Sequence, residues 1–164
     1  MLSVRLVYPK FLVIFFVFFS CVPFRIVHVD YIFPSLDVMV IFYWCVFRPE
    51  LMKNGFVFSM GILKDLLLAS PVGISAVVNL IVRTLVLKKS AYVKSTFAKL
   101  WLLFAIILGV ITIIKWLVFS FVENSWLDFE LLFIQYILSV FFYPLIHRFL
   151  NMILLILPRS AVNE

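Results

Sequence analysis

The chain has 164 residues, of which 66% are hydrophobic and only 13% are charged, and its formal net charge is +6. A soluble domain is about half apolar and about a quarter charged, and a small protein has too much surface to hide such a surplus. The composition therefore excludes a soluble enzyme, a disordered chain and a disulfide-stapled secreted module. The basic charge fits cytoplasmic loops of a membrane protein, and no basic domain suited to nucleic acid lies outside the apolar stretches.

Apolar runs such as 11–19 and 100–114 are unbroken and lack the two-residue alternation of a membrane β-barrel. The spans are therefore expected to be helical. A hydrocarbon layer of about 30 Å takes roughly 20 helical residues, so this length allows about six crossings. The sequence predicts an all-α integral membrane protein with six transmembrane helices, and residues 1–164 form a single transmembrane domain.

The first predicted span covers 8–24. Arg5 and Lys10 precede its apolar run as in a signal peptide, but no small-x-small cleavage site follows, so the segment is expected to stay as a span. The second span covers 31–47 and has Pro34 in its first turn, where a missing N–H does no harm. Cys21 and Cys45 fall near opposite ends of these two spans, so no disulfide between them is expected.

The third and fourth spans cover 55–70 and 71–88, divided by the turn signal Ser70-Pro71-Val72-Gly73. Both are shorter than the hydrocarbon layer is thick, so they form either a re-entrant hairpin or two spans in a locally thinned bilayer. The chain returns to the side it left in either case. The fifth and sixth spans cover 100–122 and 131–150.

Lysine and arginine residues are concentrated in the loops of one side, whereas Arg25 lies alone on the other. The basic side holds Arg5, Lys10, Arg48, Lys53, Lys88, Lys89, Lys94, Lys99 and Arg159. The positive-inside rule therefore predicts that both termini are cytoplasmic. The loop from Lys88 to Lys99 carries four lysines between aromatic residues, and it is expected either to lie on the inner membrane surface or to dock a cytoplasmic protein.

Polar residues inside the spans fall at a common depth of about 8–10 Å beneath the outer boundary. They are Asp37, Lys64, Asp65, Asn79 and Lys115. Lys64 and Asp65 are adjacent and point about 100° apart, so they cannot serve the same partner. We expect Asp37 and Lys115 to complete two neutral pairs in a buried polar layer that locks the helices in register.

Structural alternatives remain for most of these charges. Asp37 follows a proline and a serine and can be a first-turn acid that meets the helix dipole. Lys64 and Lys115 have long stems that can reach the interface, and the same holds for Arg83 near the inner end of its span. Asp65 is too short and too deep for this, so it requires a partner.

Catalytic and metal-binding arrangements are not supported. Ser75 lies near the outer boundary, but His147 lies about 24 Å from that boundary by helical rise, so the two cannot form a serine–histidine pair. Asp37 and Asp65 match no aspartyl-protease motif, and His28 and His147 lie on opposite sides of the membrane. We expect no enzyme activity, no cofactor and no metal.

Several short motifs occur in a characteristic order and spacing. They are Tyr43-Trp44, Arg48-Pro49-Glu50-Leu51, Gly61-Ile62-Leu63-Lys64-Asp65-Leu66-Leu67, Pro71-Val72-Gly73, Arg83 and Tyr143-Pro144-Leu145. This series, strongest between residues 43 and 83, resembles the MreD family of bacterial rod shape-determining membrane proteins.

The resemblance implies a non-enzymatic, multi-pass scaffold in the bacterial inner (plasma) membrane. Such a protein serves cell-wall elongation and rod cell shape through association with MreC and, through it, with MreB, RodA and a penicillin-binding transpeptidase. The structural or partner-binding candidates are Trp44, Arg48, Pro49, Glu50, Gly61, Asp65, Pro71, Gly73 and Arg83. Residues 48–50 fall at the cytoplasmic end of the second span, where they either end the helix or meet a partner.

An alternative function follows from a more distant likeness. MreD proteins look like the membrane substrate-binding component of energy-coupling-factor transporters, which also has six helices and a ligand pocket near the outer face. The alternative is therefore a membrane substrate-binding subunit of a small-molecule transporter. Those components commonly dock their energising partner through small residues spaced four apart on the first helix, whereas residues 11–19 are Phe, Leu, Val and Ile throughout.

Overall fold

A computed structural model describes residues 2–21, 34–93, 96–122 and 129–156. These residues form helices joined by turns, with no strand among them. The helices are α1 (Leu2–Cys21), α2 (Leu36–Phe47), α3 (Asn54–Leu67), α4 (Ile74–Val93), α5 (Phe97–Val122) and α6 (Phe129–Ile156). The all-α prediction is confirmed, and each predicted span overlaps one helix.

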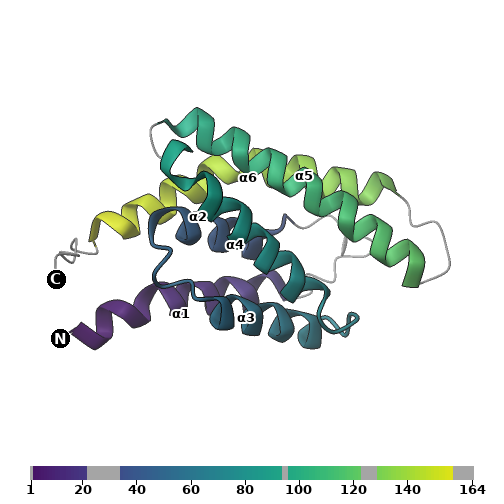
Figure 1. Ribbon diagram of the computed structural model, residues 1–164, viewed down its shortest axis with the longest axis horizontal. Helices are drawn as coiled ribbons and strands as arrows, with labels where there is room; N and C mark the ends of the chain where they lie inside the picture. The colour runs from purple at the N-terminus through teal and green to yellow at the C-terminus, as the bar shows by residue number, and fades with distance from the viewer. Residues whose placement is uncertain (1, 22–33, 94–95, 123–128, 157–164) are drawn as a thin grey trace.

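The six helices pack as an elongated bundle (Figure 1). In this view α5 and α6 run side by side along the top, α1 and α3 lie along the bottom, and α2 and α4 fill the space between. The start of α1 and the end of α6 lie at the same left-hand end of the bundle. Successive helices run in opposite directions, as short connections require.

α2 is the central helix of the bundle. Every residue from Leu36 to Val46 is buried, and the helix packs against α1, α4 and α6. A helix that is apolar all round must be enclosed by other helices, which explains the placement of α2. Aromatic rings tie it to its neighbours, since Phe42 lies 5.2 Å from Phe104 of α5 and 5.8 Å from Tyr143 of α6, measured between ring centroids.

α5 and α6 are the longest helices and face outward. Among the described residues, they alone contain stretches long and apolar enough to cross a membrane by themselves, Phe97–Val118 and Glu130–Leu155. Only 28% and 17% of the corresponding windows are buried inside the protein. Their apolar side chains therefore face the surroundings, as a lipid solvent requires. Lys10–Ser20 and Leu36–Phe47 are shorter apolar helices.

Several helix boundaries differ from the sequence-based expectation. α2 begins at Leu36, so Pro34 lies before the helix rather than in its first turn, and its carbonyl accepts a hydrogen bond from the Leu36 amide. α4 continues to Val93, beyond the predicted end at residue 88. Lysines end the apolar stretch there but are good helix formers, so they do not end the helix. Residues 22–24 and 31–33 of the first two predicted spans lie outside the described part.

α3 and α4 form a closely packed antiparallel hairpin. A Cβ atom built on Gly61 would lie 2.2 Å from the Cα atom of Ala76. Only glycine lets the two backbones approach this closely. Gly61 therefore sets the spacing of the hairpin, and this spacing brings the end of α3 up to the start of α4.

Candidate functional site

Asp37 and Lys64 form an ion pair at the start of α2. Lys64 Nζ lies 2.6 Å from Asp37 Oδ2, and the two side chains are only 9% and 1% exposed. Ser20 Oγ of α1 donates a second hydrogen bond to Asp37 Oδ1 at 3.4 Å. Asp37 also lies in the first turn of α2, where a negative charge is favoured by the helix dipole. One carboxylate thus connects α1, α2 and α3.

Asp65 binds the start of α4. Its Oδ2 accepts a 2.7 Å hydrogen bond from the Gly73 amide, and both of its carboxylate oxygens lie within 3.2 Å of the Ser75 amide. Ser70 Oγ donates a further bond to Oδ1 at 3.3 Å. The first amides of a helix have no partner inside it, and a buried carboxylate satisfies them.

The expected direct ion pair between Asp65 and Lys115 is not formed, although the two charges still interact electrostatically. The polar groups nearest to Asp65 along the chain are the unsatisfied amides that follow the α3–α4 turn, and they occupy its oxygens. The distance of each residue along its helix predicted that both lie in one layer. It gave no information on the direction in which each side chain points.

Pro71 and Gly73 shape the α3–α4 turn. The Pro71 carbonyl accepts a hydrogen bond from the Ile74 amide at 3.5 Å, and Gly73 has a φ of +109°. Glycine adopts this conformation without strain. The Gly73 amide is consequently turned toward Asp65, which explains why turn and carboxylate occur together in the sequence.

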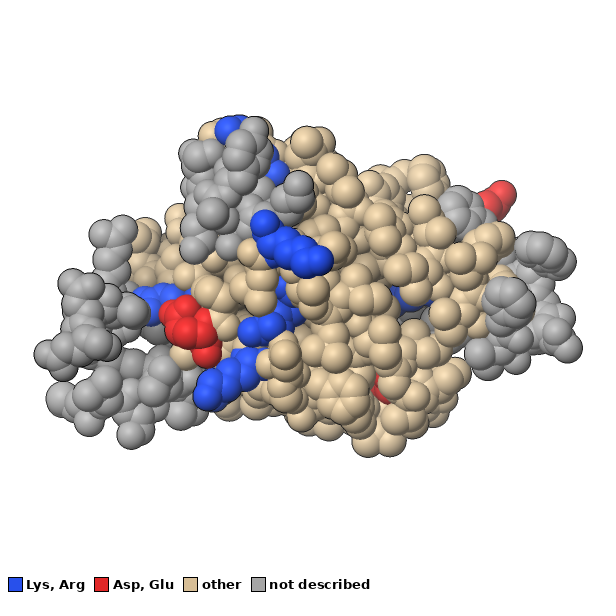
Figure 2. Space-filling model, viewed as in Figure 1, with Lys and Arg blue, Asp and Glu red and all other residues tan. Residues whose placement is uncertain are grey.

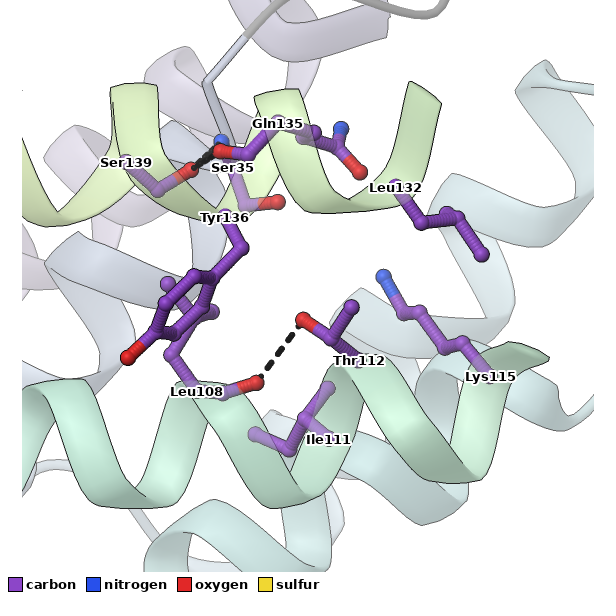
Figure 3. Close-up of a pocket in the computed structure, with 9 residues that line it drawn as sticks. All are labelled: Ser35, Leu108, Ile111, Thr112, Lys115, Leu132, Gln135, Tyr136 and Ser139. Atoms are coloured by element: carbon purple, nitrogen blue, oxygen red, sulfur yellow. Dashed lines mark hydrogen bonds between the residues drawn. The ribbon is translucent and has the colours of Figure 1, made fainter. Parts of the chain in front are cut away.

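No hydrogen bond or close ion pair joins Lys115 or Asn79 to the Asp37–Lys64 pair, although the Lys115 charge interacts electrostatically with Asp37. Lys115 lines a pocket between α5 and α6 together with Ser35, Thr112 and Gln135 (Figure 3). Asn79 is 1% exposed, and neither atom of its side-chain amide has a hydrogen-bond partner among the described residues. The structure thus divides the predicted polar layer into an ion pair, a helix cap, a buried amide and a lysine pocket.

The turn between α2 and α3 begins at Arg48. The Arg48 amide bonds to the Trp44 carbonyl at 2.8 Å, and the Met52 amide bonds to the Pro49 carbonyl at 3.2 Å. Arg48 Nη1 lies 3.5 Å from Glu50 Oε1, and the Glu50 side chain is 50% exposed. Residues 48–50 thus end the helix and still leave a carboxylate on the surface.

Arg83 of α4 holds this turn in place. Its Nε donates a hydrogen bond to the carbonyl of Met52, a residue with no exposed surface. The side chain therefore links α4 to the α2–α3 turn, in addition to any contact with lipid headgroups. Trp44 is also fully buried, so its indole packs in the core rather than on a partner-facing surface.

His147 and Ser75, which were expected at different depths in the membrane, contact different groups in the structure. The His147 ring packs among aromatic rings, 5.3 Å from Tyr43 and 5.0 Å from Phe97. Ser75 uses its amide to bind Asp65.

Sequence reasoning missed the serines that complete these contacts. Ser20 bonds to Asp37, and Ser139 Oγ of α6 accepts a 3.0 Å hydrogen bond from the Ser35 amide just before α2. Small polar residues inside apolar stretches were the available signal, because a hydroxyl in hydrocarbon requires a partner. Their partners lie far away in sequence, so the pairing could not be predicted.

Basic side chains are concentrated toward one end of the bundle. Figure 2 shows them in a band across the left and centre of the visible face, while the right-hand part is largely uncharged. Lys53, Lys88 and Lys99 are exposed, and Lys10 Nζ lies 5.8 Å from the centre of the Phe56 ring. The side chains of Arg5, Arg25, Lys89, Lys94 and Arg159 lie outside the described part.

Comparison with known families settles the assignment. The family model described as rod shape-determining protein MreD matches residues 2–153. The chain belongs to the MreD family. The match covers α1 to α5 and most of α6, so it confirms the resemblance for the bundle as a whole and not only for residues 43–83. MreD membership makes this a membrane protein of rod cell-shape determination. No curated protein and no solved structure matched the chain.

Proposed function

We propose that this MreD-family protein is a non-enzymatic scaffold of the cell-wall elongation machinery. It acts through association with MreC, which links it to MreB, RodA and a penicillin-binding transpeptidase. The observation that carries the proposal is the family match across residues 2–153. The geometry supports it, because Asp37, Lys64 and Asp65 are used to join helices to one another rather than to line a reaction site.

In the proposed topology, the protein crosses the bacterial inner membrane six times with both termini in the cytoplasm. The start of α1, the α2–α3 turn and the end of α4 lie toward the same end of the bundle, which is also the end rich in basic side chains. The positive-inside rule assigns such an end to the cytoplasm. The α3–α4 turn with Asp65 and Gly73 then lies near the outer face.

Crosslinking in native membranes tests the proposal. The full-length protein would carry an affinity tag at modest expression, and the crosslinked partners would be identified by mass spectrometry. We expect an MreC-like protein together with elongation enzymes, and an unrelated tagged multi-span protein provides the background. Recovery of elongation proteins at background level would contradict the scaffold function.

The exposed carboxylate of Glu50 offers a site-specific version of this experiment. Glu50 and Glu130 are both exposed in the described part, but they lie at opposite ends of the bundle. If the α2–α3 turn contacts a cytoplasmic partner, Glu50→Lys lowers partner recovery and the matched control Glu130→Lys does not. Equal recovery from both variants would show that residues 48–50 end α2 but do not contact the partner.

The alternative, a substrate-binding subunit of a transporter, requires room for a ligand. The pocket beside Lys115 has a cavity volume of about 10 Å³, roughly the space that a single water molecule needs. A scaffold needs no larger space. Recovery of an ATPase module in the crosslinking experiment, or ligand-dependent thermal stabilisation of the purified protein, would favour the transporter.

A further inference from the structure

Pro144 interrupts the hydrogen bonding of α6. A proline has no amide hydrogen, so the carbonyl four residues earlier, that of Val140, loses its donor within the helix. Val140 belongs to the apolar stretch Glu130–Leu155 and lies ten residues after its start, about 15 Å along the helix axis. No water is available at such a depth in a bilayer, so the carbonyl requires a donor from another helix.

Trp101 of α5 supplies that donor. Its indole Nε1 donates a 3.0 Å hydrogen bond to the Val140 carbonyl. An indole has one N–H and no acceptor, so this bond uses the whole hydrogen-bonding capacity of the side chain. The sequence motif Tyr143-Pro144-Leu145 thus has a counterpart on the neighbouring helix, and the two helices are joined where α6 lacks its own bond.

The part of α6 before the proline is held by further hydrogen bonds. Tyr136 OH donates to the Ala105 carbonyl of α5 at 3.3 Å, and Ser139 Oγ accepts a bond from the Ser35 amide before α2 at 3.0 Å. Tyr143, the residue next to the proline, is fully buried. Together with the indole bond, these contacts fix the first half of the helix at several points along its length.

The part after the proline, Leu145–Ile156, is an arm with weaker support. Within the described part of the chain, no side chain of this arm makes a hydrogen bond to another helix. The arm packs on the bundle through Leu150, which is fully buried, and through the rings of His147 and Phe149. Its remaining large apolar side chains are mostly exposed, namely Leu145, Met152 and Leu155 at 62%, 66% and 79%.

Such an arm can change its direction at low cost. Segments with few buried contacts and no hydrogen bonds to their neighbours open more easily than the rest of a protein. Lipid tails are as apolar as leucine, so an apolar arm that moves through lipid exchanges one apolar contact for another. The contrast between the two halves of α6 therefore locates the flexible point at the proline.

We propose that Pro144 is a hinge in α6 and that the Trp101–Val140 hydrogen bond is the latch that fixes its angle. With the latch closed, the arm Leu145–Ile156 keeps one direction; with the latch open, the arm swings while the first half of α6 stays in place. The arm lies at the end of the bundle where the chain also begins (Figure 1), and it carries the exposed Arg148. Its angle therefore decides which surface α6 offers at the basic end.

Distances between spin labels test the hinge in the full-length protein. In a background with Cys21→Ser and Cys45→Ala, the purified protein in lipid nanodiscs carries one label at Lys53→Cys and one on the arm at Met152→Cys, both exposed positions. A matched pair combines Lys53→Cys with Ile137→Cys, which is exposed on the first half of α6. Double electron–electron resonance measures the distance distribution of each pair. No partner protein is present, so the result is independent of the proposed scaffold function.

Trp101→Phe removes the donor and keeps an aromatic ring. The arm has 12 residues, from 145 to 156, or about 18 Å, so a change of about 20° in its direction moves its tip by about 6 Å. We expect the distribution of the arm pair to shift or widen by about this amount and the matched pair to stay as in the labelled parent. An unchanged arm pair would overturn the latch. Equal widening of both pairs would overturn the hinge, because the bundle would then loosen as a whole.

Pro144→Ala separates the hydrogen bond of the indole from its packing. Alanine restores an amide at position 144, which donates to the Val140 carbonyl within the helix, so the indole bond is no longer required. We expect Trp101→Phe to change neither distance in the Pro144→Ala background. If Trp101→Phe moves the arm as far there as it does in the parent, the indole acts through packing and the latch is rejected.

Discussion

Lys64 and Asp65 are adjacent in sequence but serve different parts of the bundle. Their side chains point about 100° apart around α3, so Lys64 reaches Asp37 of α2 while Asp65 reaches the amides of Gly73 and Ser75. Together they tie α3 to two helices at one level. This explains why a pair of opposite charges is placed inside an otherwise apolar helix.

Asp65→Ala should lower the free energy of unfolding by about 1–3 kcal/mol, because buried amides at the start of α4 lose their acceptor. Asp65→Asn should be milder, since one oxygen still accepts. Thermal unfolding of the purified protein measures both changes. A midpoint for Asp65→Ala equal to that of the wild type would show that the cap does not contribute to stability.

The Asp37–Lys64 pair should show strong coupling in a double-mutant cycle. Lys64→Met leaves a buried carboxylate without its counter-ion, which typically costs about 3–5 kcal/mol, whereas removing both charges is far less harmful. We therefore expect Lys64→Met to accumulate poorly in membranes and Asp37→Asn in the same chain to restore it. If the losses of membrane accumulation simply add in the double variant, the ion pair does not stabilise the protein.

At the scale of elements, the α3–α4 hairpin depends on the small size of Gly61. Gly61→Ala would force a Cβ to within 2.2 Å of the Ala76 backbone, so the helices must separate and the Asp65 cap must lengthen. Gly55 in the same helix has nothing within 4 Å of an added Cβ and provides the matched control.

Gly61→Ala should thus lower the unfolding midpoint, while Gly55→Ala should be neutral or slightly stabilising, as expected for alanine in an exposed helical position. The comparison separates crowding from helix propensity. Equal midpoints for the two variants would show that the hairpin tolerates a wider spacing.

Sequence predicted the helices well but not their partners. Unbroken apolar stretches fix the number and type of elements, and the signal at Pro71 and Gly73 locates the hairpin turn. The partner of Asp65 could not be predicted, because it depends on the direction of a side chain and on the approach that Gly61 allows. The full burial of Trp44 likewise follows from the position of α2 at the centre of the bundle, which emerges only when the helices are packed.

At the scale of the whole molecule, helix lengths are unequal. α2 has 12 residues and α3 has 14, about 18 and 21 Å at 1.5 Å per residue, whereas the hydrocarbon layer is about 30 Å thick. α5 and α6, with 26 and 28 residues, exceed that thickness. The short α2 is enclosed by other helices, so its length does not have to match the lipid, but α3 exposes Phe58 and Leu66 and does meet it.

Cysteine labelling tests the proposed topology at the two ends of α3. In a background with Cys21→Ser and Cys45→Ala, Val72→Cys lies in the α3–α4 turn and Lys53→Cys lies at the α2–α3 turn, and both positions are exposed. With the basic end in the cytoplasm, an impermeant maleimide should label Val72→Cys in spheroplasts and label Lys53→Cys only after the membrane is opened. The reverse pattern would invert the topology. Protection of Val72→Cys in both conditions would instead make α3 and α4 a re-entrant hairpin, since a span of about 21 Å reaches the far side only where the bilayer thins around it.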